Sequence, residues 1–358
     1  MLPDQQADLE ARYSGVGAVR ASHHFDVGAL EDHLSDRLPG FARPLEVRQF
    51  KGGQSNPTYS ISSPGGRWVL RRKPPGELLP SAHAVEREYR VIAALNRIDF
   101  PVPEALLVCE DADVIGTPFY VMEQVEGRVF WDPLIPALPR DERRAVYDSM
   151  LDVLARLHGA DVEAIGLADF GRPGNYFARQ IRRWSKQYRA SETETIGEMD
   201  RLIEWLPDNV PDDDSVSLVH GDYKLDNLIV HPSEPRVVAV IDWELSTLGH
   251  PLGDLTQSLA ARSMEFSPFA ELTDDQLGEL GIPTIDETIA HYCELAGRPD
   301  VEDLDFYFAF NLFRSAAVNQ GIVGRVRDGT AASEHALEIW SVRSIAESAL
   351  AYARRLGA

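Results

Sequence analysis

The sequence predicts an α+β fold in two lobes, a small β-rich lobe followed by a larger, mainly helical one. Short apolar and β-branched runs separated by turns fill the first third of the chain, whereas long helical patterns fill most of the rest. A strand, a polar loop and a hairpin interrupt the helical patterns between residues 218 and 242. With 358 residues, the chain is long enough for two compact units.

The expected boundaries follow from these patterns. Residues 1–22 are expected to be loosely ordered. Residues 23–125 are expected to form the N-terminal lobe, a nucleotide-binding unit with a five-stranded sheet and a helix at 81–97, and residues 126–358 the helical C-terminal lobe. Helices of the second lobe are expected at 141–158, 174–190, 197–206, 286–296, 303–322 and 332–355.

Composition indicates an ordinary globular protein, with 44% hydrophobic and 26% charged residues. No apolar run approaches the roughly 20 residues that cross a bilayer, and residues 1–6 do not resemble a signal peptide. Cys109 and Cys293 are too few for a disulfide framework or a zinc site. We therefore expect a cytoplasmic protein without a membrane partner.

The most informative segment reads HGDYKLDN at residues 220–227 and is followed by an apolar run that ends at Asp242. An Asp, an Asn five residues later and a second Asp after a strand are typical of kinase phosphoryl transfer. Asp222 would accept the proton of an acceptor hydroxyl, and Asn227 and Asp242 would hold Mg²⁺ through hard oxygen ligands. The alternative is a loop whose side chains cap their own backbone.

Together with WELSTLGHPLGD at residues 243–254, this segment resembles the aminoglycoside phosphotransferase superfamily. Within that superfamily it is most similar to the kinase-like domain fused to some acyl-CoA dehydrogenases. Upstream support comes from GGQSNPTY at 52–59, LRRKPPG at 70–76 and FYVME at 119–123, so the resemblance spans residues 45–257. It implies a bilobal protein-kinase-like fold and a kinase that uses ATP and Mg²⁺.

The glycine-containing loop after the first strand is a candidate phosphate loop. Gly52 and Gly53 would let the backbone approach a phosphate, and Ser55 or successive N–H groups would bind it. An ordinary hairpin turn is the alternative. The loop lacks the G-x-G-x-x-G pattern of protein kinases, so Ser55 or backbone amides would have to do more of the phosphate binding.

The strand at residues 68–71 carries the next candidates. Arg71 stands where kinases have a lysine, and Lys73 would share its strand face, so either could hold the α- and β-phosphates. The following helix offers Glu86 and Glu88 as partners, and Glu88 fits the family pattern better; an exposed helical glutamate is the alternative.

The resemblance also implies several supporting residues. Main-chain groups from Glu123 to Val125 are expected to contact the purine. His220 is expected to orient the catalytic loop, and Asp254 to support it by hydrogen bonds, although a helix N-cap explains Asp254 equally well.

One expected helix has a basic face, formed by Arg179, Arg182, Arg183, Lys186 and Arg189. Phe177, Ile181, Trp184 and Tyr188 should form its buried face. Arg182 and Arg183 could bind an anionic acceptor such as coenzyme A, or could simply be solvated next to acidic neighbours. Arg314 on a later helix could also face the acceptor, although packing explains it as well.

The sequence therefore predicts a kinase for a small hydroxylated molecule, with a hydroxyacyl-CoA as the preferred acceptor. An aminoglycoside or other amino-alcohol is the second choice, and the net charge of −22 would suit such a cation while disfavouring nucleic acid. A catalytically silent nucleotide-binding scaffold and a two-metal phosphoesterase are further alternatives. A regulated protein kinase is not expected, because the stretch from Asp242 to Asp254 is too short for an activation loop.

Overall fold

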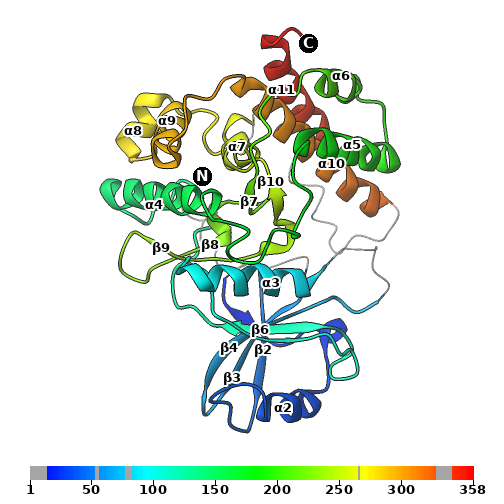
Figure 1. The fold of residues 1–358 in the computed structure, drawn as a ribbon, viewed down its shortest axis with the longest axis vertical. Coiled ribbons are helices and arrows are strands. Elements are labelled where there is room, and N and C mark those ends of the chain that lie inside the picture. The colour runs from blue at the N-terminus through cyan, green and yellow to red at the C-terminus, as the bar shows by residue number, and fades with distance from the viewer. Residues whose placement is uncertain (1–13, 53–55, 77–82, 265–266, 328–340) are drawn as a thin grey trace. The chain divides into compact units, whose positions relative to one another are not determined.

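The computed structural model describes residues 14–52, 56–76, 83–264, 267–327 and 341–358 (Figure 1). Contacts divide the chain into two compact units. Unit 1 comprises Met1–Val153, Glu163–Leu167 and Lys224–Ser246, and unit 2 comprises Leu154–Val162, Ala168–Tyr223 and Thr247–Ala358. Unit 1 thus extends beyond the expected lobe 23–125, because residues 126–153 and a later hairpin pack within it.

Unit 1 contains an antiparallel sheet with the strand order β1-β2-β3-β4-β6-β5. The strands are β1 (Val16–Gly17), β2 (Glu46–Phe50), β3 (Thr58–Ser63), β4 (Gly66–Arg72), β5 (Ala105–Cys109) and β6 (Phe119–Glu123). The described part of the sheet has six strands rather than the expected five, since Val16 pairs with Phe50 at its edge. A two-residue strand is too short to produce an alternating sequence pattern.

The two faces of this sheet pack against different helices. Successive residues of a strand point to opposite faces, so neighbours on β4 have different surroundings. Leu70 is buried with Leu30 and Leu34 of α2 (Val27–Ser35), a helix that the sequence did not predict. Arg71 points the other way, toward Glu88 of α3 (Val85–Leu95). Alternation along one strand therefore places a charged residue next to the second helix.

Unit 1 also contains most of a long helix and a hairpin. Helix α4 (Arg140–His158) agrees with the predicted helix, and its residues up to Val153 belong to unit 1. Strand β8 (Leu228–Val230) pairs with β9 (Val237–Val240), which confirms the predicted hairpin. The Ser149 hydroxyl of α4 accepts a hydrogen bond from the Val237 amide at 3.0 Å. This contact anchors the hairpin that carries the residues predicted to bind metal.

Unit 2 is mainly helical and confirms the α+β class. Its helices are α5 (Tyr176–Ser191), α6 (Gly197–Trp205), α7 (Pro251–Ala260), α8 (Asp274–Leu280), α9 (Ile285–Ala296), α10 (Leu304–Arg327) and α11 (Val342–Arg355). β7 (Ser217–Val219) pairs with β10 (Thr247–Gly249). Helix α8 was not predicted, and part of the range expected for the last helix, residues 332–340, lies outside the described residues.

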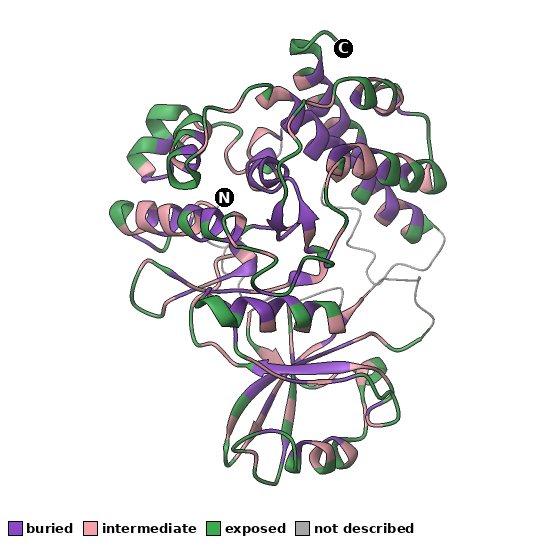
Figure 2. Cartoon of the chain, viewed as in Figure 1, coloured by how far each residue is buried: buried purple, intermediate pink, exposed green. Residues whose placement is uncertain are grey.

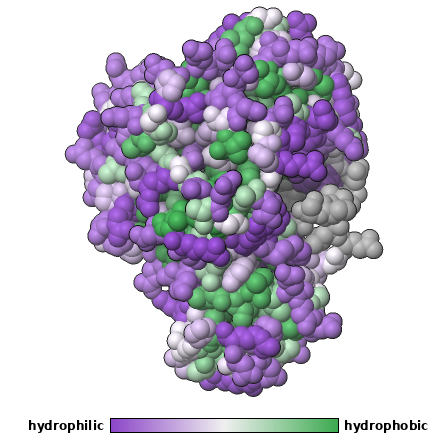
Figure 3. Space-filling model, viewed as in Figure 1, coloured by the Kyte–Doolittle hydropathy of each residue, from purple (hydrophilic) through white to green (hydrophobic). Residues whose placement is uncertain are grey.

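The core of unit 2 is built around α10, whose residues from Phe306 to Phe313 are all buried (Figure 2). A helical segment that is buried on all sides shows no amphipathic pattern, and between Phe306 and Phe313 only Asn311 is neither aromatic nor aliphatic. The face seen in Figure 3 is largely hydrophilic, in keeping with the excess of acidic residues. Within the described ranges, no helix is both long and apolar enough to cross a membrane.

Candidate active site

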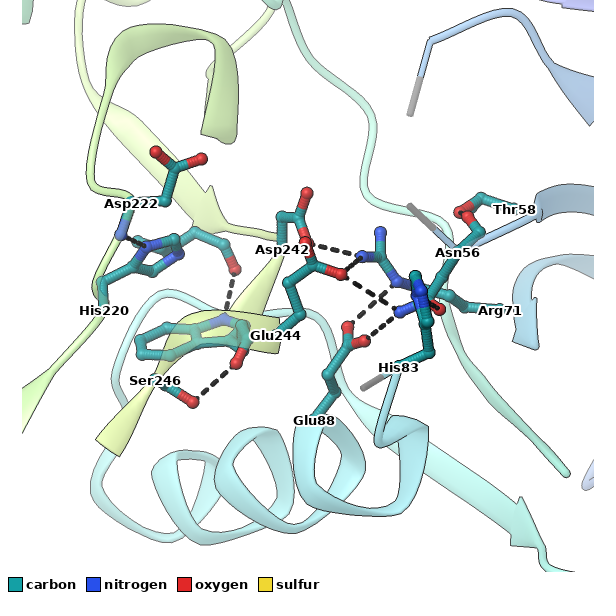
Figure 4. A network of polar contacts seen from close by, with 12 residues as sticks. Asn56, Thr58, Arg71, His83, Glu88, His220, Asp222, Asp242, Glu244 and Ser246 are labelled. Carbon is teal, nitrogen blue, oxygen red and sulfur yellow. Dashed lines mark hydrogen bonds and ion pairs between the residues drawn. The ribbon is translucent and has the colours of Figure 1, made fainter. Parts of the chain in front are cut away.

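An ion cluster centred on Arg71 lies within unit 1 (Figure 4). Its Nε lies 3.0 Å from Glu88 Oε2, and its Nη2 lies 2.5 Å from Asp242 Oδ1 and 3.7 Å from Glu244 Oε2. The side chains of Arg71 and Glu88 are only 8% and 0% exposed. A basic residue on the third main strand paired with an acid on the next helix is the arrangement found in kinases.

Lys73, the other candidate for the phosphate-binding residue, has a separate partner. It follows the last residue of β4, and its Nζ lies 3.0 Å from Glu86 Oε2. Both side chains of this pair are partly exposed, at 23% and 38%. Each basic residue therefore pairs with a different acid of α3, and only Arg71 also contacts Asp242.

Asn56 connects the loop after β2 to this cluster. Its Nδ2 donates to Glu88 Oε1 at 2.7 Å and to Glu244 Oε2 at 3.4 Å, and its Oδ1 lies 3.0 Å from His83 Nδ1. The residue is only 1% exposed. The sequence motifs include Asn56 and Glu244 but gave neither a role, and they do not include His83, because no local spacing links these three residues.

The electrostatics of the cluster are unbalanced, since three carboxylates surround one guanidinium. Burial raises the pKa of Glu88 to about 7, and Asp242 and Glu244 add to the rise, while Arg71 and the Tyr120 hydroxyl oppose it. Burial would lower the pKa of Arg71, but the neighbouring carboxylates raise it above its ordinary value. The cluster is therefore a place where additional positive charge would be stabilised.

The raised pKa of Glu88 predicts a pH dependence of stability. The folded protein holds this proton more tightly than the unfolded chain does, so the contribution of Glu88 to the unfolding free energy should fall as the pH rises from 4.5 to about 7. Urea denaturation at several pH values would give the slope of the unfolding free energy against pH. Glu88→Gln should remove the part of this slope between pH 4.5 and about 7 that Glu88 contributes. Glu86→Gln, on the same helix, is the matched control, and an unchanged slope in Glu88→Gln would contradict the prediction.

The predicted metal ligands Asn227 and Asp242 are held at the open end of the β8–β9 hairpin. Asn227 immediately precedes β8, Asp242 follows β9 after one residue, and the Ile241 amide donates to the Asn227 carbonyl at 3.0 Å. Asp242 has a φ of 66°, a left-handed conformation that is uncommon outside glycine and often occurs at functional sites. Both side chains offer hard oxygen atoms, so this pair fits Mg²⁺ completed by phosphate and water oxygens.

The residues expected to contact the nucleotide are only partly described. Gly52 is half-buried, whereas Gly53 and Ser55 lie outside the described residues. Glu123 ends β6, and its amide donates to the Glu104 carbonyl at 2.9 Å. Val125 is half-buried, and its main chain makes no hydrogen bond to any residue that the structure describes.

In unit 2, buried polar groups shape the loop that contains Asp222. The two carboxylate oxygens of Asp254 accept the amides of His220 at 2.7 Å and Gly221 at 2.8 Å, and the Asp222 amide donates to His220 Nδ1 at 3.2 Å. Gly221 has a φ of +80°, which favours glycine. The N-cap alternative for Asp254 is wrong, because the side chain of His250 caps α7.

His158 is a further residue that sequence reasoning missed. Its Nε2 lies 3.3 Å from Asp254 Oδ2, and its Nδ1 lies 2.7 Å from the Tyr292 hydroxyl. Burial alone would raise the pKa of Asp254, but His158 and His220 lower it. An ionised Asp254 suits its hydrogen bonds, because both carboxylate oxygens then act as acceptors.

The aromatic face of α5 is buried as predicted, and it comprises Phe177, Ile181, Trp184 and Tyr188. On the basic face, Arg179 donates to the carbonyls of Gly174 and Arg172, and Arg189 pairs with Asp200 and Glu192.

Arg182 and Arg183 are exposed, and neither has an acidic partner among the described residues. Arg183 lies over the Trp184 ring, 5.2 Å from its centroid. Arg314 instead donates to the Gly221 carbonyl at 2.7 Å, so it contacts the catalytic loop. The alternative interpretation, in which neighbouring acidic residues neutralise this face, therefore does not hold for Arg182 and Arg183 among the residues that the structure describes.

The chain is similar in sequence to known proteins of one enzyme family. The model of the phosphotransferase enzyme family matches residues 46–288. The chain is 44% identical to acyl-CoA dehydrogenase family member 10 of Mus musculus and 43% identical to member 11 of Rattus norvegicus. These matches cover 95% and 94% of this chain but only 32% and 44% of those proteins, so the chain spans less than half the length of the curated relatives it matches.

Solved structures show the same fold. A Ralstonia eutropha protein assigned to the aminoglycoside phosphotransferases is 48% identical, with a TM-score of 0.83 over 93% of this chain and 99% of its own. The aminoglycoside phosphotransferase APH(4)-Ia is 16% identical, with a TM-score of 0.59 over 93% of this chain and 99% of its own, a likeness of fold alone. The chain therefore belongs to the phosphotransferase enzyme family that includes the aminoglycoside phosphotransferases, and it is a phosphotransferase with the fold of small-molecule kinases.

Proposed function

We propose that this protein transfers the γ-phosphoryl group of ATP, with Mg²⁺, to a hydroxyl group of a small molecule, preferably a hydroxyacyl-CoA. The observation that carries the proposal is the buried cluster of unit 1, in which Arg71 contacts both Glu88 and Asp242. Three carboxylates around one guanidinium leave negative charge that a divalent cation would balance. Two solved structures with the same fold contain an adenine nucleotide. One is described as a ternary complex with AMP-PNP and hygromycin B, and the other as a complex with ADP and spectinomycin. These complexes support an adenine nucleotide as the phosphoryl donor of this protein.

In the proposed site, Asn227 and Asp242 would hold Mg²⁺, which neutralises charge on the phosphates during transfer. Arg71, oriented by Glu88, would bind the α- and β-phosphates, and Lys73 is the other candidate for this role. Gly52, Gly53 and Ser55 would form the phosphate loop. The purine would bind the main chain from Glu123 to Val125, with the Val125 amide as donor because the Glu123 amide already donates to Glu104.

Asp222 is the proposed general base. The acceptor oxygen attacks the γ-phosphorus, its proton passes to the Asp222 carboxylate, and the bond from the γ-phosphorus to the bridging oxygen breaks to release ADP. Asp254 and His220 hold the backbone of this loop. Asp222 and Asn227 are five residues apart in the sequence, so the proposed base and one proposed metal ligand come from the same segment of the chain.

The preferred acceptor class rests on two observations. The curated relatives are acyl-CoA dehydrogenase family members, of which this chain covers less than half. Arg182 and Arg183 form an exposed basic surface in a protein of net charge −22, and such a surface suits the phosphates of a CoA ester. An aminoglycoside or amino-alcohol is the second candidate, because the overall acidity would attract a cation.

The test is a turnover assay. ADP release from MgATP would be measured with a panel of hydroxyacyl-CoAs and aminoglycosides, with Asp222→Asn as the inactive control. Turnover with hydroxyacyl-CoAs alone supports the proposal, whereas turnover with aminoglycosides alone favours the second candidate. Tight nucleotide binding without turnover on any compound would favour a catalytically silent scaffold.

The basic surface on α5 gives a separate prediction. Arg182→Glu/Arg183→Glu should raise the KM for a hydroxyacyl-CoA about ten-fold or more, because attraction of the CoA phosphates becomes repulsion, while the KM for MgATP stays nearly constant. Arg201→Glu/Arg354→Glu is the matched control, since both arginines are exposed in unit 2 and have no acidic partner in the described ranges. Equal KM values in the two variants would rule out this surface as the acceptor site.

A further inference from the structure

Asp222 has a side-chain partner that no sequence motif indicated. Gln257, near the end of α7, donates from its Nε2 to Asp222 Oδ1 at 3.1 Å. On its other side, Gln257 Oε1 accepts from Arg314 Nη1 at 3.3 Å. The same arginine donates through Nη2 to the Gly221 carbonyl at 2.7 Å, so one guanidinium contacts both the loop backbone and the amide that binds the carboxylate.

The orientation of the Gln257 amide is fixed by chemistry. Arg314 can only donate, and an ionised Asp222 can only accept. The amide satisfies both neighbours in one of its two orientations, with oxygen toward Arg314 and nitrogen toward Asp222. A carboxylate at this position would keep the bond from Arg314 and lose the bond to Asp222, and a hydrocarbon would lose both bonds.

Buried contacts join the elements that carry these residues. Asn311 of α10, which is 1% exposed, donates to the Gly253 carbonyl at 3.0 Å and to the Thr256 hydroxyl at 2.8 Å on α7. Arg314 lies one turn after Asn311, and its guanidinium lies 5.6 Å from the centroid of the buried Trp184 ring on α5. The donor that orients Gln257 is thus fixed by packing on one side and by an aromatic ring on the other.

We propose that Gln257 and Arg314 are positioning residues that set the direction of the Asp222 carboxylate. This inference rests on the proposed role of Asp222 as the general base. It also gives Arg314 a role in the catalytic loop rather than in direct binding of the acceptor. A base that is rotated out of line with the acceptor hydroxyl loses rate without losing nucleotide affinity.

The test uses Gln257→Glu, which puts a second carboxylate beside Asp222 while keeping an acceptor for Arg314. Its matched control is Gln276→Glu on α8, where glutamate preserves the capping box with Thr273 and changes the net charge equally. Gln257→Glu should lower kcat by about 10- to 100-fold, with the KM for MgATP changed by less than about two-fold. Gln276→Glu should behave as the wild type.

A second measurement needs no acceptor. Gln257→Glu should lower Tm by about 2–4 °C. The double variant Asp222→Asn/Gln257→Glu, which exchanges the amide and the carboxylate, should recover most of that loss, because an amide again faces a carboxylate. Additive changes in Tm, or equal kcat in the two glutamate variants, would overturn the inference. If the wild type turns over no compound, the proposed function fails, and the exchange of residues still decides whether Gln257 positions Asp222.

Discussion

Replacing Asp222 with asparagine is expected to lower kcat by about 10²- to 10⁴-fold while nucleotide affinity stays nearly constant. Asparagine keeps the size of the side chain and an oxygen that can accept from Gln257. It cannot take up the proton of the acceptor hydroxyl, so only the chemical step should suffer. Steady-state kinetics with saturating MgATP, together with calorimetric titration of nucleotide, would measure both quantities.

The matched control for this variant is Asp212→Asn, an exposed aspartate of the same unit that has no hydrogen bond or ion pair in the described part of the chain. It makes the same chemical change and should leave both quantities at the wild-type level. If Asp222→Asn retained more than about a tenth of the wild-type kcat, Asp222 would not be the general base.

Replacing Arg71 with methionine is expected to destabilise the protein by about 3–5 kcal/mol, the usual effect of removing one partner of a buried ion pair. The side chain of Glu88 is 0% exposed, and without Arg71 it would face Asp242 and Glu244 without a cation. Nucleotide affinity should fall as well, because Arg71 is the proposed phosphate ligand. Urea unfolding monitored by tryptophan fluorescence and titration with MgATP would measure the two effects.

Two comparison variants separate stability from binding. Arg71→Met/Glu88→Gln removes both charges but keeps an oxygen for Asn56, so it should recover most of the stability without recovering nucleotide affinity. Lys73→Met breaks a partly exposed pair and should cost less than about 1 kcal/mol. If Lys73→Met weakened nucleotide binding more than Arg71→Met did, Lys73 would be the phosphate ligand.

The catalytic loop and the hairpin were predictable because their information is local. Asp222, Asn227 and Asp242 lie close together in the chain, and the apolar runs around them have the lengths of short strands. The buried face of α5 was predictable for the same reason, since its aromatic residues recur with the helical period.

Other elements left no local pattern. The two-residue β1 is too short to alternate, and the short helix α8 owes its stability to capping and packing rather than to an amphipathic repeat. Helix α2 is fixed by the burial of Leu30 and Leu34 against the sheet, a contact with residues far along the chain. Such elements become apparent only when their partners are in place.

The sequence by itself determined the fold class, the family, and the residue types of the proposed base and metal ligands. Only the tertiary structure decided that Arg71 pairs with Glu88 and Asp242 while Lys73 pairs with Glu86, and that Gln257 contacts Asp222. These choices depend on where β4 ends and on which faces of α3, α7 and α10 meet other elements. Local periodicity specifies a helix or a strand, but the partner of a side chain is set by packing between residues distant in the chain.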